Sequence, residues 1–200
     1  MEFDGTVSIA DVTSEEVWLA LSDPVMIKQA LPGCQFLVAV DEESPDFDAL
    51  AESAPEEDPE TLPAADPEEI AERAFVDGGR YAARMQLSVG SVKPAFDTIV
   101  TIDERAFPVV NASGEGDSSG SSFEMGSGME LVEIDDGVDV VWWAEADVFG
   151  RIAQMGQRVI NPVANRVIGR FFDRVEDQLR DVSTDTDSTG GLRNRLSGLF

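Results

Sequence analysis

Residues 150–180 read GRIAQMGQRVINPVANRVIGRFFDRVEDQLR, and this stretch decides the fold. From residue 151 its apolar side chains recur at a spacing near 3.6 residues, the period of a helix with one buried face. The stripe consists of Ile152, Met155, Val159, Val163, Val167, Phe171 and Val175. Thirty helical residues would be about 45 Å long, enough to cross six or seven strands spaced about 4.8 Å apart. Pro162 lies inside the pattern and predicts a kink near residues 159–161.

The sequence before this helix alternates between apolar and polar residues, as strands with one buried face do. Five or six such segments follow from Ile70 onward and predict an antiparallel meander. The side chains expected on the inner face are Tyr81, Ala83, Met85, Leu87, Val89, Phe96, Thr98, Val100, Ile102, Phe123, Met125, Met129, Leu131, Val138, Val140, Trp142, Ala144 and Ala146. Residues 114–122 are rich in Gly and Ser and are expected to form a flexible hairpin connection.

The N-terminal segment predicts a strand, two short helices and a second strand. Residues 2–12 alternate, and Thr13 or Ser14 is then placed to cap a helix, with Glu16 completing a capping box from Thr13. Asp23-Pro24 begins the second helix, Pro32-Gly33 ends it, and residues 34–40 form the next strand. The whole order predicts an α+β domain in which a curved antiparallel sheet of six to seven strands surrounds one long C-terminal helix.

Residues 41–69 differ in composition from the rest. They contain thirteen acidic residues, no basic residue and several prolines. This composition predicts a solvated, largely disordered loop inserted in a domain that spans residues 1–182. The alternative is a short helix near residues 47–52 that docks on the domain.

The chain is strongly acidic, with 14 Lys and Arg against 40 Asp and Glu and a formal net charge of -26. Only Lys28 and Lys93 are lysines, and this haloarchaeal type of composition fits a very salty cytoplasm, where charge repulsion is screened. The alternative is a mesophilic acidic protein with an acidic insertion. Either way, the absence of a basic stripe argues against nucleic-acid binding.

Three features of the sequence indicate a cytoplasmic location. Cys34 is the only cysteine, so no intrachain disulfide forms. The N-terminus shows no signal peptide, and no run of about 18 apolar residues predicts a membrane-spanning helix.

The sequence offers little for catalysis. It contains no histidine, no nucleotide-binding or nucleophile motif and no paired cysteines that would hold a metal. Cys34 follows a Pro-Gly turn and could act as a nucleophile, but no base accompanies it, so a small core side chain is the better interpretation. We therefore predict no catalytic residue and no metal site.

The apolar side chains are more informative, because many should point between the sheet and the long helix. The residues predicted to bind a ligand are Trp18, Leu31, Met85, Phe96, Phe123, Met125, Trp142, Met155, Val159 and Phe171. The alternative is that they interdigitate as a dry core. Small inner positions and adaptable methionines favour a cavity; the small residues are Gly126, Ala144, Ala146, Gly156 and Ala164.

Several motifs resemble those of the family of the carbon monoxide dehydrogenase G subunit. They are Val17-Trp18, Leu21-Ser22-Asp23-Pro24, Ala30-Leu31-Pro32-Gly33-Cys34, residues 89–93 (VGSVK), residues 148–158 (VFGRIAQMGQR) and Phe171-Phe172. The resemblance covers residues 1–180 apart from the acidic insertion. It implies the helix-grip fold of the START-like (polyketide cyclase/Bet v 1) superfamily, with a deep apolar cavity. It also implies an accessory role beside a molybdenum hydroxylase of the carbon monoxide dehydrogenase type, through membrane recruitment and the handling of a menaquinone-like lipid quinone.

The last residues, 183–200, form a polar linker and a short basic tail. An amphipathic helix there would place Leu192, Leu196, Leu199 and Phe200 on one side, next to Arg193 and Arg195. Such a tail is expected to anchor at the inner face of the membrane, to dock on a partner protein, or to fray.

Three functions remain open from the sequence. The first is a non-catalytic carrier of a lipid or quinone that helps recruit its enzyme to the membrane. The second is an assembly factor or co-chaperone that binds protein only. The third is a cyclase or hydrolase enzyme on the same fold, which would need polar groups that converge inside the cavity, and the inner faces offer only Tyr81, Thr98 and Ser127.

Overall fold

The computed structural model describes residues 1–88 and 93–186, with side chains described up to residue 181. Within them, seven strands form one antiparallel sheet in the order β1-β7-β6-β5-β4-β3-β2. The strands are β1 (Glu2–Ala10), β2 (Cys34–Ala39), β3 (Arg80–Gln86), β4 (Ala95–Ala106), β5 (Val109–Ser118), β6 (Ser121–Ile134) and β7 (Gly137–Gly150). The helices are α1 (Ser14–Ser22), α2 (Pro24–Ala30), α3 (Phe47–Ser53), α4 (Pro67–Arg73), the 3-10 turn η1 (Ala153–Met155) and α5 (Gln157–Thr186).

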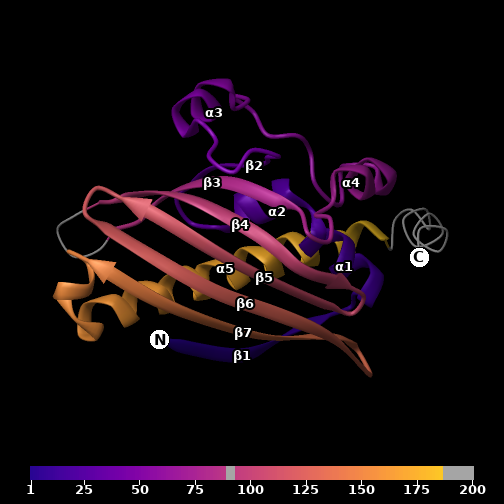
Figure 1. The fold of residues 1–200 in the computed structure, drawn as a ribbon. Coiled ribbons are helices and arrows are strands. Elements are labelled where there is room, and N and C mark those ends of the chain that lie inside the picture. Colours follow the sequence, from indigo (N-terminus) through magenta and orange to yellow (C-terminus); the bar gives the residue numbers. More distant parts are fainter. Residues whose placement is uncertain (89–92, 187–200) are drawn as a thin grey trace.

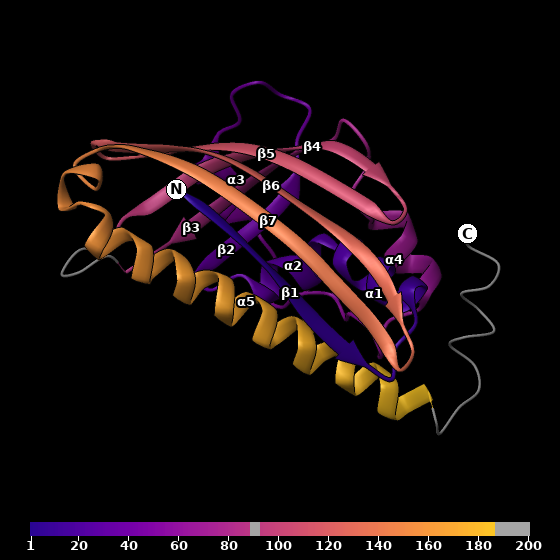
Figure 2. The same cartoon turned by 90° about the horizontal axis from the view of Figure 1, so that it is seen from below.

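The sheet curves around α5, which runs across its concave face (Figures 1 and 2). Helices α1 and α2 close the space at the end of the sheet where α5 finishes. This arrangement confirms the predicted α+β fold with a long C-terminal helix. No helix in the described residues has both the length and the hydropathy that a membrane crossing requires.

The strand register confirms the predicted inner face. Residues directly opposite each other on neighbouring strands point to the same side of a sheet. Thr98 lies opposite both Ala83 and Gly116, and Phe123 lies opposite both Gly116 and Val148, so the predicted inner residues form continuous rows. Val89 lies outside the described residues.

The two short N-terminal helices have the predicted caps. The Thr13 hydroxyl accepts from the Glu16 backbone N–H at 3.2 Å, and the Glu16 carboxylate accepts from the Thr13 N–H at 2.8 Å, which is a capping box. Asp23 caps α2 by accepting from the Val25 N–H at 2.9 Å. Its carboxylate is also bound by the Arg73 guanidinium of α4, so one residue joins three helices.

The prediction of a disordered acidic loop at residues 41–69 is wrong. This segment contains α3 and the beginning of α4, and α4 extends past Ile70, where the sequence predicted the first strand of the meander. A few apolar side chains attach it to the domain: Leu62 and Ile70 are buried in the core, and the Phe47 ring lies 6.4 Å from that of Phe36. The acidic side chains of this segment point outward. Its composition therefore predicted a solvated loop, because the few apolar side chains that attach it to the domain contribute little to the overall composition.

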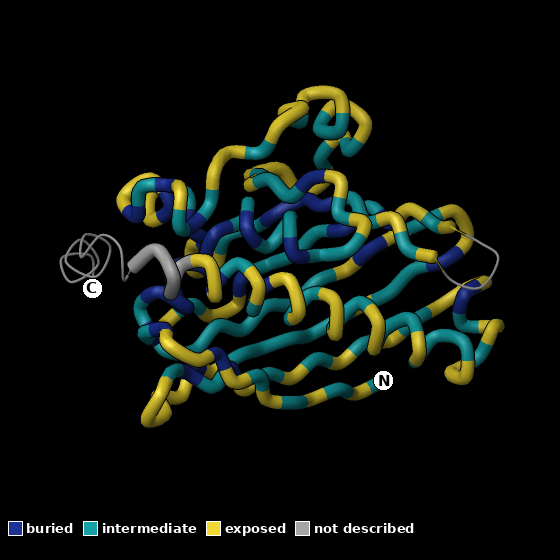
Figure 3. The backbone as a smooth tube through the Cα atoms, turned by 180° about the vertical axis from the view of Figure 1, so that it is seen from behind, coloured by how far each residue is buried: buried dark blue, intermediate teal, exposed yellow. Residues whose placement is uncertain are grey.

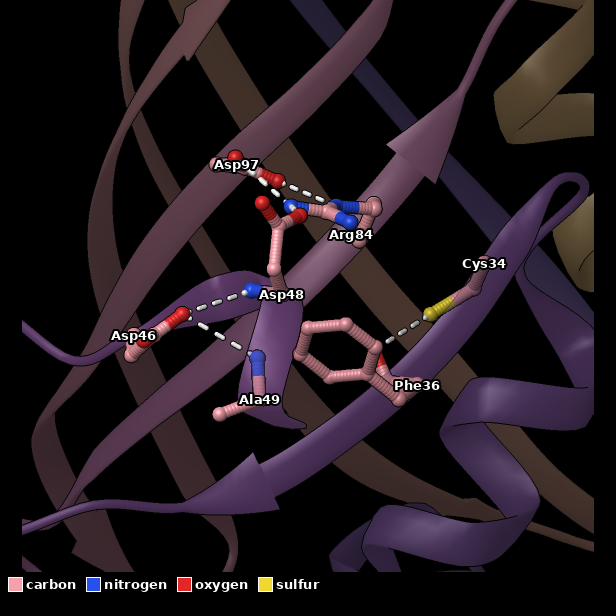
Figure 4. A network of polar contacts seen from close by, with 7 residues as sticks. All are labelled: Cys34, Phe36, Asp46, Asp48, Ala49, Arg84 and Asp97. Carbon is pink, nitrogen blue, oxygen red and sulfur yellow. Dashed lines mark hydrogen bonds and ion pairs between the residues drawn. The ribbon is translucent and has the colours of Figure 1, made fainter. Parts of the chain in front are cut away.

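Polar contacts hold α3 on the outer face of the sheet (Figure 4). The Arg84 guanidinium lies between two carboxylates, with Nη2 at 3.0 Å from Asp97 Oδ2 and 2.9 Å from Asp48 Oδ1. Asp97 belongs to β4 and Asp48 to α3. The short docked helix near residues 47–52 is therefore the alternative that the structure supports.

The flexible connection expected at residues 114–122 is a tight turn. Strand β5 continues to Ser118 and β6 begins at Ser121, so only two residues join them, with Gly120 at a φ of 83°. The glycine content has another cause: a Cβ on Gly116 would lie 2.5 Å from the Phe123 ring. Gly116 is thus a strand residue that makes room for an aromatic neighbour.

Helix α5 begins later than the apolar period predicts. Residues 153–155 form η1, and Gly156, at a φ of 78°, separates it from α5. The helix then continues through Pro162 to residue 186 as one element. Its C-terminal part is the most deeply packed, because Val175 and Leu179 are fully buried.

Candidate functional site

An apolar cluster lies at each end of the layer between the sheet and α5, and Ala112 packs against a third cluster, which consists of Phe75, Tyr81 and Ile102. The larger cluster includes Trp18 of α1, Val140 of β7, and Val175 and Leu179 of α5. The smaller cluster lies where α5 begins. It consists of Phe96 and Ile152, with Leu87, Phe123, Val148, Val159, Ile160 and Val163 packed against them.

Between these ends the inner face of the sheet carries mostly small side chains. We call this area the floor and define it as Ala112 and Gly114 of β5, Met125 and Ser127 of β6, and Ala144 and Ala146 of β7. Ser127 lies opposite Ala112 and Ala144, and Met125 lies opposite Gly114 and Ala146, so the six residues form two adjacent rows. Five of the six are Gly, Ala or Ser.

All six floor residues keep part of their surface accessible. Each belongs to a strand with neighbours on both sides, so this accessible surface does not come from a sheet edge. Figure 3 shows the strands behind α5 largely at intermediate burial. The small side chains of the floor therefore fill little of the layer between the sheet and α5.

The side of α5 that faces the sheet is also apolar. Val163, Ala164, Val167, Ile168 and Phe171 of α5 are all partly buried. Neither these residues nor the floor include a titratable side chain. The arrangement can surround an apolar molecule and offers no group for acid–base chemistry on its surface.

The ten predicted ligand residues occupy different environments. Trp18 and Phe96 are buried in the two end clusters, and Met155 is 37% exposed at the molecular surface. The others are partly buried: Leu31, Met85, Phe123, Met125, Trp142, Val159 and Phe171. Their contact with a ligand remains a prediction.

Aromatic side chains pack in both end clusters and on both sides of the floor. The Trp18 ring meets Phe107 edge-on at 5.4 Å and has the Arg105 guanidinium 5.1 Å from its centre. Phe96 meets Phe123 at 5.2 Å, close to one side of the floor. Trp142 lies 5.2 Å from Phe172 of α5, next to Ala144 on the other side. Phe123 and Trp142 thus lie in the inner rows on either side of the floor.

Sequence reasoning missed five of the six floor residues as ligand contacts and misplaced one glycine. Ala112, Gly114, Ser127, Ala144 and Ala146 were not among the predicted ligand residues, although their small size at inward positions was the signal. Gly126 was expected on the inner face, but it lies opposite Glu145 on the outer face, where an added Cβ would meet Glu145 and Trp143. Strict alternation from Met125 would have placed it correctly.

The three inner polar side chains do not converge. The Tyr81 hydroxyl accepts from the Val76 N–H at 3.0 Å, and the Ser127 hydroxyl donates to the Ala112 carbonyl at 3.5 Å. The Thr98 hydroxyl is buried without a partner among the described residues. Thr98 lies in the same cross-strand row as Gly116 and Phe123. Phe123 is four residues before Ser127 on β6, so the two rows are about 13 Å apart along the strands. The residues described here also contain no group of three potential metal ligands.

Cys34 has the properties of an unreactive thiol. Burial raises its pKa from 9.0 to about 11, although the nearby positive charge of Lys28 opposes the shift. Its Sγ donates to the Phe36 carbonyl at 3.3 Å. The thiolate is the reacting species, so this environment disfavours nucleophilic chemistry.

We expect folded Cys34 to react with iodoacetamide at pH 8 about 100-fold more slowly than the same thiol in urea-unfolded protein, because a two-unit rise in pKa lowers the thiolate fraction by that factor. Between pH 9 and about 11 the unfolded chain loses this proton while the folded chain keeps it. This group's contribution to the free energy of unfolding therefore falls over that window. Equal rates in both states at pH 8 would contradict the expectation.

Comparison with known proteins gives one family and one fold. Residues 72–180, more than half of the chain, match the family model of the carbon monoxide dehydrogenase G subunit (CoxG). No curated protein matches the sequence.

Solved structures share the fold. A conserved protein from Geobacillus kaustophilus is 20% identical, with a TM-score of 0.65, over 93% of this chain and 97% of its own. An aromatase/cyclase from a Streptomyces species is 10% identical, with a TM-score of 0.55, over 96% and 98%. A protein from Thermus thermophilus is 12% identical, with a TM-score of 0.53, over 89% and 96%. At these identities the likeness concerns the fold alone, and it agrees with the helix-grip architecture.

Proposed function

The chain belongs to the CoxG family, that of the carbon monoxide dehydrogenase G subunit, and from this premise we propose that it is a non-catalytic accessory protein that holds an apolar ligand between its sheet and α5. The observation that carries the proposal is the floor. It consists of small, partly accessible side chains on interior strands, between two closed apolar clusters. A protein that needed only a dry core would fill these positions with larger side chains.

The proposed ligand is a lipid or a lipid quinone of the menaquinone type. An isoprenoid chain matches the apolar residues of α5 and the floor, which hold no charge that would have to be desolvated. Burying about 300 Å² of such a ligand contributes roughly 7 kcal/mol before the costs of association. That is enough for a carrier that must also release its cargo.

The proposed partner is a molybdenum hydroxylase of the carbon monoxide dehydrogenase type, which the chain helps to recruit to the membrane. The support for this partner is family membership, since the matched model is named for a subunit of that enzyme. The basic, apolar tail proposed as a membrane or partner contact (Leu192, Arg193, Arg195, Leu196, Leu199 and Phe200) lies outside the described residues.

A catalytic role has less support. A cyclase or hydrolase on this fold would need polar side chains that converge on a substrate. Thr98 and Ser127 lie two strands apart and in different rows, and Tyr81 is engaged with the backbone of Val76. The aromatase/cyclase among the similar structures shares only the fold at 10% identity.

The test is extraction of the purified protein with organic solvent, followed by mass spectrometry of the extract and native mass spectrometry of the intact protein. We expect about one apolar molecule per chain. A protein without extractable ligand that also fails to bind the apolar dye 1-anilinonaphthalene-8-sulfonate would contradict the proposal and favour a role in protein binding only.

A further inference from the structure

One partly buried arginine lacks the acidic partner that comparable residues have. Lys28, Arg73 and Arg84 are also partly buried, and each is paired with an aspartate. Arg80 donates to two backbone carbonyls. Arg105, at the end of β4, has no ion-pair partner among the described residues, and burial lowers the pKa of its guanidinium. Because the chain has 40 acidic residues, this lack is a property of the site and not of the composition.

The guanidinium of Arg105 is held in place by neutral groups. Its Nε and Nη2 donate to the Ser22 hydroxyl at 3.3 and 3.1 Å, and its central carbon lies 5.1 Å from the centre of the Trp18 ring. In Arg73 the same edge of the guanidinium binds both carboxylate oxygens of Asp23. In Arg105 a hydroxyl occupies this edge, and Nη1 has no acceptor among the described residues. Nη1 and the remaining N–H of Nη2 form a planar fork that can bind a carboxylate through two parallel hydrogen bonds.

An exposed aromatic side chain lies next to this guanidinium. Phe107 is 51% exposed, and it follows Arg105 by two residues. Its ring meets the Trp18 ring edge-on at 5.4 Å, and Trp18 is the same ring that Arg105 covers. One buried tryptophan therefore carries both the arginine and the exposed phenylalanine.

An exposed valine is held near Arg105 by its two neighbours in the sequence. The Phe75 N–H donates to the Ser22 carbonyl at 2.9 Å, and the Asp77 carboxylate accepts from the Arg105 backbone N–H at 2.9 Å. Val76 lies between these two residues and is 58% exposed. Val76 and Phe107 are the two most exposed large apolar side chains among the residues that the structure describes.

We call Val76, Arg105 and Phe107 the arginine patch, which lies at the end of the molecule where α1 and α4 are found (Figure 1). Its composition is that of a protein-binding hot spot, in which arginine and aromatic side chains contribute most and the surrounding contacts exclude water. The position of Arg105 also suits the C-terminus of α1, whose dipole favours a cation. That role alone does not explain why two large apolar side chains are exposed beside it.

From these observations we propose that the arginine patch binds a partner protein that presents an aspartate or glutamate side chain between apolar residues. The carboxylate accepts from the open fork of Arg105, and the apolar residues cover Val76 and Phe107 and keep water away from the ion pair. Charge complementarity selects this partner, because the central cation has no counter-charge among the described residues. The inference rests on the proposed function for the identity of the partner, but it does not depend on a bound ligand.

The test is photo-cross-linking of the full chain in the cells that make it, with p-benzoylphenylalanine in place of Phe107 so that the phenyl ring is kept. The same residue in place of Phe149 is the matched control, since Phe149 is 47% exposed at the end of β7. We expect a cross-linked partner protein at residue 107 and none at residue 149. Adding Arg105→Gln should lower the yield at least about tenfold, because the carboxylate of the partner then loses its counter-charge. Adding Val76→Glu, at an exposed position, should have the same effect through charge repulsion.

Mass spectrometry of the cross-linked peptide tests the chemistry of the partner. The peptide should contain Asp or Glu, and replacing that residue by Arg should abolish cross-linking to the chain with Arg105 and restore it to the Arg105→Glu variant. Circular dichroism verifies that each variant is folded. Equal products at residues 107 and 149, a product that Arg105→Gln and Val76→Glu leave unchanged, or a cross-link to the C-terminal residues of this chain itself would each overturn the proposal.

The outcomes also separate this inference from the proposed function. A cross-linked partner that is not a molybdenum hydroxylase would support the arginine patch and contradict the partner proposed above. An apolar ligand extracted from a protein that gives no product at residue 107 would overturn only this inference and leave ligand carriage supported.

Discussion

Asp23→Ala is expected to lower the free energy of unfolding by about 3 kcal/mol, the low end of the range for removing one partner of a buried ion pair. Asp23 is fully buried, and its carboxylate accepts from Arg73 Nε at 2.9 Å and from Nη2 at 2.6 Å. It also accepts from the Val25 N–H at the start of α2, a cap worth about 1 kcal/mol by itself. The substitution therefore removes a helix cap and leaves the Arg73 guanidinium without its carboxylate.

The measurement is urea unfolding at constant KCl, followed by circular dichroism. The matched control is Asp177→Ala, because Asp177 also pairs with an arginine, Arg180, at 3.3 Å, but its side chain is 73% exposed. We expect this control to change the free energy of unfolding by less than about 0.5 kcal/mol. Similar losses for both variants would show that burial of Asp23 does not set its contribution.

Ser127→Phe is expected to weaken ligand binding by about 70-fold. Ser127 lies in the floor on β6, between Ala112 and Ala144, so a phenyl ring there projects from the inner face toward α5. A ring that displaces about 100 Å² of ligand contact removes roughly 2.5 kcal/mol of apolar burial. That free energy corresponds to a factor of about 70 in Kd.

Binding is measured by titration with 1-anilinonaphthalene-8-sulfonate, and the retained natural ligand is measured by extraction. The matched control is Glu124→Phe, which places the same ring on the same strand but on the exposed outer face. The control should bind like wild type. If Ser127→Phe binds as well as Glu124→Phe does, the floor is not the ligand site.

The inner face of the sheet could be predicted because strand alternation depends only on neighbouring residues. Tyr81, Thr98, Phe123 and Trp142 were placed on the helix side by period alone, and the register agrees. The helix caps at Thr13 and Asp23 are likewise local, since each donor lies within three residues of its acceptor. Family membership followed from motifs and is supported by the match over residues 72–180.

Features that depend on distant contacts could not be predicted in this way. The acidic insertion is held by Phe47 on Phe36 and by Arg84 between Asp48 and Asp97, pairs that only the folded sheet brings together. The same holds for Gly116, whose role is to make room for the Phe123 ring on the next strand. A glycine that avoids a clash and a glycine in a flexible loop look identical in sequence.

The floor was only partly predicted for a related reason. The sequence prediction selected mainly large apolar residues as ligand contacts. Two of them, Trp18 and Phe96, are instead buried in the apolar clusters at the two ends. The partly accessible floor consists instead mainly of small residues, among them Ala112, Gly114 and Ser127. How much volume small residues leave unfilled depends on the elements packed around them, so no single position encodes it.

The strand order has a consequence for how the chain is made. β1 forms the edge of the sheet by pairing with β7, with Glu2 opposite Glu145 and Ile9 opposite Val138. The chain is synthesised at about 5–20 residues per second, and β7 is the last of the seven strands to be made. β1 therefore cannot pair with β7 until the other six strands have left the ribosome. Until then it is an unpaired edge, and its acidic outward side chains Glu2 and Asp4 discourage pairing with other nascent chains. Helix α5, the last helix that the structure describes, is made later still, so the inner face of the sheet is covered only after all seven strands have emerged.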